Sequence, residues 1–308
     1  MKAAVHTRYG PPDVVRIVDV ERPNAAANEV LVKVHAATVN RTDCGFRAAH
    51  PWIVRFFSGL TKPKATILGC EFAGEVEALG RDATAFEIGD RVFGFSEDRF
   101  GAHAEHLTMP QDGPIATIPP DLSFEEIAPS TEGSHYALSL ITRARIRGGQ
   151  RVLVIGGTGA VVTAVADTEH LELVRGLGAD RVIDRTVEDF TQDDRTYDVV
   201  LDAVGKSSFA RCRRLLEPRG IYLSTDLGPL SQNPFLALVT PLLGRRRVMF
   251  PIPPKHSARE LGRIREMLVA GTFRPIVDRR YPLDRIVDAY RYVETGQKIG
   301  NVVITVPF

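Results

Sequence analysis

The first 120 residues alternate between short apolar runs and clusters of turn residues. Glycine, proline, asparagine and aspartate gather at 10–13, 22–24 and 89–90, and apolar residues recur between them. Runs of this length bounded by turn residues predict strands, here over residues 14–20, 29–36, 71–79 and 90–95. Many short strands at this spacing predict a barrel or a sandwich.

The pattern becomes helical after residue 120. Ser123 and Glu126 have the spacing of a capping box, in which a serine begins a helix and a glutamate three residues later binds back to it. Apolar residues at helical spacing follow through Ile141, and the pair Gly148-Gly149 predicts the end of the segment.

Strands and helices alternate from Arg151 onward. The pattern predicts strands at 152–155, 181–184, 197–202 and 221–224, helices at 170–176 and 259–270, a turn at 279–283 and a last strand at 301–306. Alternation of this kind is typical of a parallel sheet covered by helices, so we expect an α/β fold after the strand-rich first part.

A glycine turn, residues 156–160, lies between two apolar runs that both predict buried strands. Gly156, Thr158 and Gly159 are typical of a turn that cradles a phosphate, where glycines let the backbone approach and a following helix offers free N–H groups. The second apolar run, 161–166, begins at once. Parallel neighbouring strands need a crossover of a dozen or more residues, so the helix that should follow this turn is missing from the sequence. The alternative interpretation of residues 156–160 is a plain hairpin loop.

Bulk composition narrows the class of protein. The chain has 308 residues, a formal net charge of +1 and three widely spaced cysteines. The charge gives no case for a nucleic-acid or membrane partner, and few, scattered cysteines indicate a reducing compartment. There is no apolar run of roughly eighteen residues and no signal-peptide core. We therefore expect a cytoplasmic protein.

Seven short motifs follow one another along the chain, which are 9–13 (YGPPD), 39–43 (VNRTD), 68–75 (LGCEFAGE), 89–93 (GDRVF), 178–184 (GADRVID), 198–205 (DVVLDAVG) and 300–304 (GNVVI). In these motifs and their order the chain resembles the zinc-independent quinone oxidoreductase (zeta-crystallin-like) branch of the medium-chain dehydrogenase/reductase superfamily. The resemblance implies a GroES-like barrel domain over 1–120, completed by 272–308, and a doubly wound Rossmann-like domain over 121–271.

The chain departs from this family after Ala160. Family members carry roughly fourteen further residues there, including the amphipathic helix that a parallel crossover needs. Either the printed sequence joins segments that a helix separates in the full polypeptide, or the helix is deleted and the cofactor site is damaged. We favour the first explanation. A Cα–Cα distance of about 3.8 Å between Ala160 and Val161, as across one trans peptide, would contradict it.

The resemblance implies a nicotinamide cofactor, NADPH or alternatively NADH. An acid at Asp167 would accept hydrogen bonds from the adenosine ribose and disfavour a 2′-phosphate, whereas Arg185 could bind one. A solvated acid that caps a helix is the alternative for Asp167. The expected cofactor-binding residues are Gly156, Thr158, Gly159, Asp167, Asp202, Val204, Gly205 and Asn301.

Zinc-dependent relatives place cysteine at the position of Asn40 and histidine at that of Cys70, so we expect no zinc here. Cys70 is then a small core residue. Without a metal, a donor must stabilise the developing oxyanion. Asn40 and Asp43, in the spacing Asn-x-x-Asp, are the candidates, with His135 and Tyr136 as proton donors. A packed histidine is the alternative for His135.

The expected activity is hydride transfer to a quinone or to an α,β-unsaturated ketone or aldehyde. A zinc-type alcohol dehydrogenase and a non-catalytic, structural or nucleic-acid-binding relative are the alternatives. Residues 233–244 are apolar but carry two prolines, which indicates a mobile segment or a subunit contact rather than a membrane span. Residues 248–250 predict an edge strand that could pair with a second copy, so we expect a homodimer.

Overall fold

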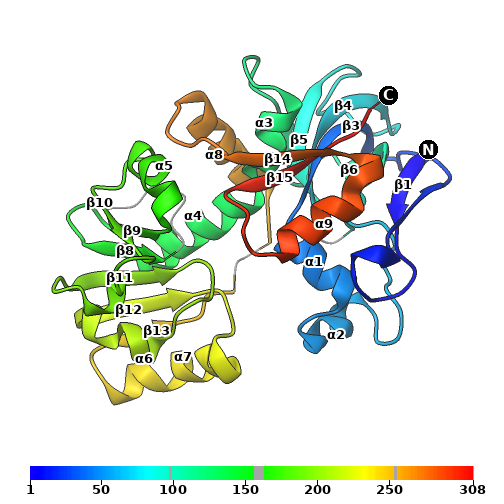
Figure 1. The fold of residues 1–308 in the computed structure, drawn as a ribbon. Helices are drawn as coiled ribbons and strands as arrows, with labels where there is room; N and C mark the ends of the chain where they lie inside the picture. Colours follow the sequence, from blue (N-terminus) through cyan, green and yellow to red (C-terminus); the bar gives the residue numbers. More distant parts are fainter. Residues whose placement is uncertain (97–98, 156–162, 253–254, 308) are drawn as a thin grey trace. The chain divides into compact units, whose positions relative to one another are not determined.

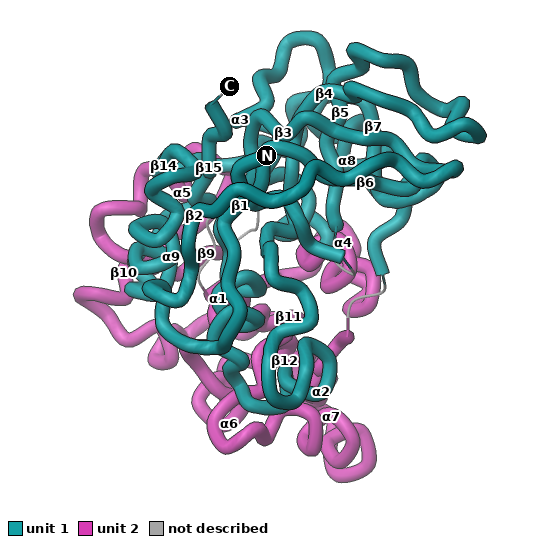
Figure 2. The backbone as a smooth tube through the Cα atoms, turned by 90° about the vertical axis from the view of Figure 1, so that its right-hand side faces the viewer, with its two compact units in different colours: residues 1–135, 255–308 teal, residues 136–254 magenta. Residues whose placement is uncertain are grey.

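The computed structural model describes residues 1–96, 99–155, 163–252 and 255–307. The chain divides into two compact units (Figure 2). Unit 1 comprises residues 1–135 and 255–308, and unit 2 comprises residues 136–254. Unit 2 is therefore an insertion in the sequence of unit 1.

Unit 1 is built on a seven-stranded sheet, mostly antiparallel, with the order β14-β15-β3-β4-β5-β7 and with β6 paired to β3. A separate pair, β1 and β2, runs antiparallel. The strands are β1 (Lys2–Val5), β2 (Arg16–Asp19), β3 (Glu29–Val39), β4 (Glu71–Leu79), β5 (Arg91–Phe95), β6 (His106–Pro110), β7 (Ile115–Thr117), β14 (Val277–Pro282) and β15 (Asn301–Thr305). The expected strand-rich first part is confirmed.

The helices of unit 1 are α1 (Arg41–Ala48), α2 (Arg55–Ser58), α3 (Phe124–Ile127), α8 (Ala258–Val269) and α9 (Ile286–Glu294), and α4 (Glu132–Ala144) begins in unit 1 and continues into unit 2. Helices α3, α8 and α9 pack against the seven-stranded sheet (Figure 1). The predicted capping box is present, since the Ser123 side chain and Glu126 exchange hydrogen bonds at the start of α3.

Unit 2 is a six-stranded parallel sheet with the order β10-β9-β8-β11-β12-β13. Its strands are β8 (Val152–Ile155), β9 (Thr163–Ala166), β10 (Arg181–Asp184), β11 (Tyr197–Asp202), β12 (Leu216–Ser224) and β13 (Arg247–Met249), and its helices are α5 (Leu171–Gly176), α6 (Phe209–Cys212) and α7 (Gln232–Leu243). Numbered from β8, this is the order 3-2-1-4-5-6 of the doubly wound dinucleotide-binding sheet, and the expected α/β class is confirmed.

Strands β8 and β9 are parallel neighbours, with Leu153 opposite Thr163 and Ile155 opposite Val165. Only seven residues separate them in the sequence, fewer than a helical crossover requires. The junction between residues 160 and 161, and with it the Cα distance that would separate the two explanations, lies outside the described residues.

Three segments differ from expectation. Residues 279–283, expected to be a turn, lie mostly in β14, because the backbone of this strand pairs with β15 although its side chains are largely polar. Residues 233–244 form most of helix α7, with Pro241 inside it. The first part of the chain extends to residue 135 rather than 120 and resumes at 255 rather than 272, because α3 packs on β3 and β4 and α8 packs on β7.

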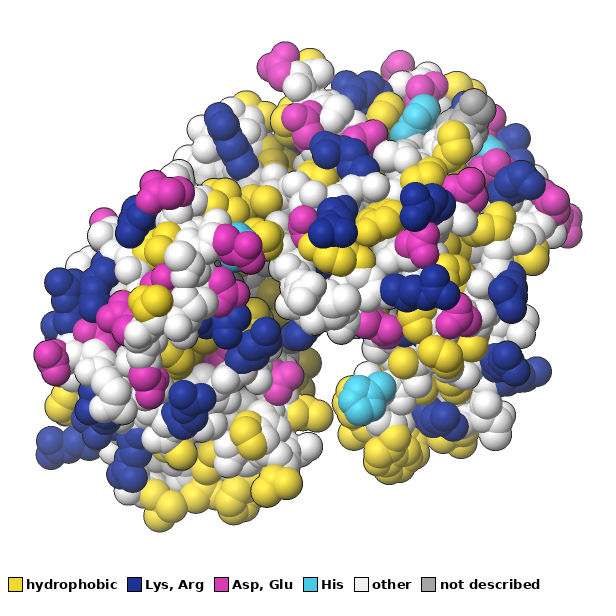
Figure 3. All heavy atoms as spheres, in the orientation of Figure 1, with side chains coloured by type: hydrophobic (Ala, Val, Ile, Leu, Met, Phe, Trp, Pro, Cys, Tyr) yellow, Lys and Arg dark blue, Asp and Glu magenta, His cyan; other side chains and the backbone are white. Residues whose placement is uncertain are grey.

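The α7 helix exposes an apolar face. Its exposed large side chains are Phe235, Leu238, Leu242 and Leu243, and hydrophobic side chains gather over α7 and over α2 in Figure 3. Within the described part of the chain, no helix combines the length and hydropathy that crossing a bilayer requires.

Candidate active site

Asn40 occupies the junction between β3 and α1. Its extended backbone ends the strand, its Oδ1 accepts a hydrogen bond from the Asp43 N–H at 2.9 Å, and Asp43 Oδ2 accepts one from the Asn40 N–H at 3.0 Å. The second Asp43 oxygen accepts the N–H of Gly69 at 3.0 Å. The structure therefore brings the predicted pair together, as a reciprocal helix cap that also holds the segment before β4.

Burial raises the pKa of Asp43 to about 7, although its hydrogen bonds with Asn40 and Gly69 oppose this shift. Position 69 excludes residues other than glycine, because its φ is +91° and a Cβ atom there would lie 2.7 Å from the His103 backbone nitrogen.

The Asn40 amide also contacts Cys70. Its Nδ2 donates to Cys70 Sγ at 3.1 Å, and both side chains are buried. Burial, together with the nearby carboxylates, raises the pKa of the thiol well above its usual range. The positions where zinc-dependent relatives carry two metal ligands thus hold an amide and a neutral thiol bonded to each other.

Glu71 connects three segments of unit 1. Its Oε2 accepts a hydrogen bond from Thr38 Oγ1 at 2.7 Å. Its Oε1 accepts from the Thr131 N–H at 3.0 Å, Thr131 Oγ1 at 2.9 Å and the Glu132 N–H at 2.7 Å. This buried carboxylate therefore joins β3 and β4 to the start of α4.

Glu132 and Thr42 are site residues that the sequence reasoning missed. Thr42 Oγ1 donates to Glu132 Oε1 at 2.5 Å, which brings the first turns of α1 and α4 together. Burial, and secondly the charge of Glu71, raises the pKa of Glu132 to about 8. The residues are 90 positions apart in sequence, so no local pattern could pair them.

His135 is buried in a stack of aromatic rings. Its Nδ1 lies 2.6 Å from Glu260 Oε1, and its ring lies 3.7 Å, between centroids, from that of His256. The His256 ring stacks in turn on Phe95. Tyr136, the next residue, is half-buried and begins unit 2. Both remain predictions as proton donors.

The described residues contain no group of three or more histidine, cysteine, aspartate or glutamate side chains that could hold a metal ion.

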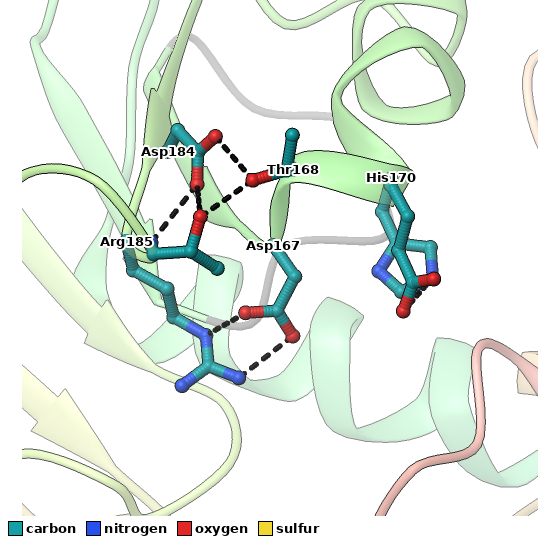
Figure 4. A network of polar contacts seen from close by, with 7 residues as sticks. Asp167, Thr168, His170, Asp184 and Arg185 are labelled. Atoms are coloured by element: carbon teal, nitrogen blue, oxygen red, sulfur yellow. Dashed lines mark hydrogen bonds and ion pairs between the residues drawn. The ribbon is translucent and has the colours of Figure 1, made fainter.

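In unit 2, Asp167 and Arg185 form a bidentate ion pair beyond the ends of β9 and β10. Arg185 Nε lies 2.6 Å from Asp167 Oδ1, and a terminal guanidinium nitrogen lies 2.7 Å from Oδ2 (Figure 4). Beside them, Thr168 Oγ1 donates to Asp184 at 2.6 Å. The acid expected to bind the adenosine ribose and the arginine that could bind its 2′-phosphate thus lie side by side at the edge of the sheet.

Asp202 organises the loop after β11. Its carboxylate accepts hydrogen bonds from the Gly205 N–H at 2.8 Å, the Ser207 N–H at 2.9 Å and the Tyr222 hydroxyl at 3.0 Å. Gly205 has a φ of +66°, and a Cβ atom there would lie 2.5 Å from Asp226. Val204 is half-buried in the same loop. Asp202 is itself buried, so its observed role is to fix the loop backbone.

Gly156, Thr158 and Gly159 lie outside the described residues. Asn301 belongs to unit 1, where its Nδ2 donates to the Ile276 carbonyl at 3.1 Å. A cavity of about 470 Å³ in unit 2 is lined by none of the predicted residues, but by Phe209, Arg213, Pro218, Thr240, Leu243, Gly244, Arg245 and Arg246.

Comparison with known proteins agrees with this architecture. Residues 26–120 match the model of the alcohol dehydrogenase GroES-like domain, and residues 177–304 match that of a zinc-binding dehydrogenase. A 2-methylene-furan-3-one reductase of Solanum lycopersicum is 29% identical, over 99% of this chain and 79% of its own length. A chloroplastic NADPH-dependent alkenal/one oxidoreductase of Arabidopsis thaliana is 28% identical, with the same coverage.

Among solved structures, the quinone oxidoreductase from Coxiella burnetii superposes with a TM-score of 0.87. It is 26% identical, and the match covers 100% of this chain and 99% of that one.

Proposed function

Because the chain belongs to the medium-chain dehydrogenase/reductase superfamily, we propose that it is an NAD(P)H-dependent oxidoreductase acting without zinc. It transfers hydride to a quinone or to the activated double bond of an α,β-unsaturated ketone or aldehyde. The names of its relatives, an alkenal/one oxidoreductase and a quinone oxidoreductase, support this substrate class.

The observation that carries the zinc-free part of the proposal is the contact between Asn40 and Cys70. An amide that donates a hydrogen bond to a protonated thiol does not fit a Zn²⁺ site, which takes thiolate, imidazole or carboxylate ligands. Glu71, the adjacent carboxylate, already accepts hydrogen bonds from three residues. These donors therefore do not fit the metal that the family model's description names.

The residues at the edge of the unit 2 sheet fit one end of a dinucleotide. Asp167 or Arg185 would contact the adenosine ribose or its 2′-phosphate, and the loop after β11 lies beyond the carboxyl end of its strand, where ligands of such sheets bind. A bound reduced nicotinamide supplies the hydride. We propose NADPH as the preferred cofactor, since Arg185 offers a guanidinium that can exchange Asp167 for a phosphate.

Within unit 1, the Asn40 amide has two N–H groups, of which Cys70 takes one. The second would donate to the substrate oxygen as negative charge develops there. Asp43 holds Asn40 in this orientation through the reciprocal cap.

Direct titration of the purified protein with NADPH and with NADH, followed by turnover of an enone and a benzoquinone, tests the proposal. We expect binding of NADPH, turnover of at least one acceptor, and no zinc by metal analysis. Failure to bind either nucleotide would refute the enzyme assignment, and zinc-dependent oxidation of an alcohol would favour the alcohol dehydrogenase alternative.

We further propose that the protein is a cytoplasmic homodimer. Strand β13 is the edge strand of the unit 2 sheet, and an edge strand offers unpaired backbone groups to a second copy. The molar mass measured by sedimentation at several protein concentrations tests the dimer, and a monomer throughout would contradict it.

A further inference from the structure

The carboxyl group of Glu132 is fixed at the start of α4 by two separate contacts. Its backbone N–H donates to Glu71 at 2.7 Å, and its side chain accepts the Thr42 hydroxyl at 2.5 Å. Backbone and side chain are thus positioned independently. A half-buried glutamate held this way loses the rotamer freedom that a surface glutamate keeps.

The surroundings of Glu132 favour its protonated form. Burial raises its pKa to about 8, and the carboxyl groups of Glu71 and Asp43 add repulsion. Lys298 is the cation that opposes this shift, but its Nζ donates to the Gly300 carbonyl at 2.6 Å. The carboxyl group therefore holds a proton at neutral pH, as a general acid must.

Glu132 is also the least buried residue of this acidic cluster. Asp43 and Glu71 are fully buried, whereas Glu132 and Thr42 are half-buried. The adjacent Gly133 is exposed, and a Cβ atom added there would meet nothing within 4 Å. No side chain at position 133 therefore covers the start of α4.

We propose that Glu132 is the general acid of the reduction and that Thr42 positions its carboxyl group. This rests on the proposed function. The enone accepts hydride at its β-carbon from the reduced nicotinamide, and the electron pair of the double bond moves to form an enolate. The Glu132 O–H bond then breaks as a C–H bond forms at the α-carbon, and water returns a proton to the carboxylate.

His135 is less suited to this step. It is 2% exposed, its Nδ1 is engaged with Glu260, and one ring face is covered by His256. Glu132 is the less buried of the two residues.

The test compares wild type with E132Q, T42V and T42S, with E266Q as the control. Glu266 is an exposed glutamate on α8, outside the site. We expect kcat for an enone to fall roughly 100- to 10,000-fold in E132Q, the usual range for loss of a general acid. T42V should lose less and T42S should recover most of the activity. Circular dichroism and thermal melting identify any variant that fails to fold.

Two readouts separate catalysis from structure. In wild type, kcat should fall as pH rises above about 8, because the acid is then ionised, and this limb should be absent from the residual activity of E132Q. In the ligand-free protein, infrared difference spectra between pH 6 and 9 should show two carboxylic acid bands, one from Asp43 and one from Glu132, and E132Q should keep only the band of Asp43.

The proposal is overturned if E132Q keeps kcat within twofold of wild type with the same pH profile, or if its infrared difference spectrum equals that of wild type. A wild type that binds NADPH yet reduces neither an enone nor a quinone overturns the proposed function, and Glu132's role with it. Active wild type with active E132Q overturns only the role of Glu132.

Discussion

The side-chain nitrogen of Asn40 lies 3.1 Å from the sulfur of Cys70, while its side-chain oxygen caps helix α1. One side chain therefore makes two kinds of contact. Its oxygen caps the start of α1, and its nitrogen bonds to Cys70, which is 30 residues away and directly precedes β4. Their contributions to stability can be separated by substitution.

We expect N40A to lower the free energy of unfolding by about 1–2 kcal/mol, because α1 loses its cap. N40S should cost less, since a serine hydroxyl accepts the same hydrogen bond from Asp43 N–H but cannot reach Cys70. Urea unfolding measures both variants. Equal losses would show that the cap is not the stabilising contact.

Substitution of Glu71 should lower the free energy of unfolding more than substitution of most other polar residues of unit 1. In E71A the buried N–H groups of Thr131 and Glu132 lose their acceptor, so the free energy of unfolding should drop by about 2–4 kcal/mol. E172A provides the control, because Glu172 forms an exposed ion pair with Arg175, and its loss should cost under about 1 kcal/mol. Similar losses in the two variants would contradict the prediction.

Acid should destabilise the fold through His103. Burial lowers the pKa of this imidazole to about 4, and its Nε2 donates to the Thr38 carbonyl at 2.8 Å, so the folded state holds it neutral. The unfolded chain binds a proton near pH 6.5, so this residue should reduce stability by about 2 kcal/mol between pH 7 and pH 5.

Urea unfolding of wild type and H103Q at pH 7 and pH 5 measures this contribution to stability. The free energy of unfolding should fall less between the two pH values in H103Q than in wild type. Asp43 acts in the opposite direction, because its raised pKa stabilises the folded state at low pH and that stability is lost as pH rises through about 7. It is present in both proteins, so the comparison removes its effect. An identical loss in both would count against His103.

Cofactor choice should depend on Arg185. In R185A we expect affinity for NADPH to fall roughly 10- to 100-fold while affinity for NADH changes little, because only NADPH carries the phosphate that the guanidinium would bind. R175A is the control, since Arg175 is an exposed arginine on α5 paired with Glu172. Titrations at two salt concentrations check the electrostatic origin. A parallel loss for both nucleotides would contradict a role specific to the phosphate.

Local patterns predicted most of the elements. The capping box at Ser123 and the strand over residues 197–202 are present as expected, because each depends on neighbours in sequence. Strand β14 was missed, since Arg279 and Arg280 break the apolar alternation and only pairing with β15 makes the segment a strand. Helix α7 was missed because its prolines indicate irregular structure, yet one lies near its start and the other in its last turn.

The candidate site was predictable only in part. The spacing of Asn40 and Asp43 is local, and the structure joins them within one helix cap. Glu71, Thr42 and Glu132 meet through contacts that span 60 to 90 residues, so only the packed sheet brings them together. Burial and the neighbouring carboxylates then raise the pKa of Glu132, and no motif encodes that effect.

The stack of His135 on His256 has a consequence for how unit 2 is inserted into the sequence of unit 1. These two residues flank the points where unit 2 interrupts unit 1, so the interrupted ends lie side by side. A domain whose flanking ends meet can accept or lose an insert without strain on its own fold. A short linker from residue 135 to residue 255 would turn unit 1 into one continuous polypeptide. Unit 1 is then the parent domain, and unit 2 is a domain inserted into it.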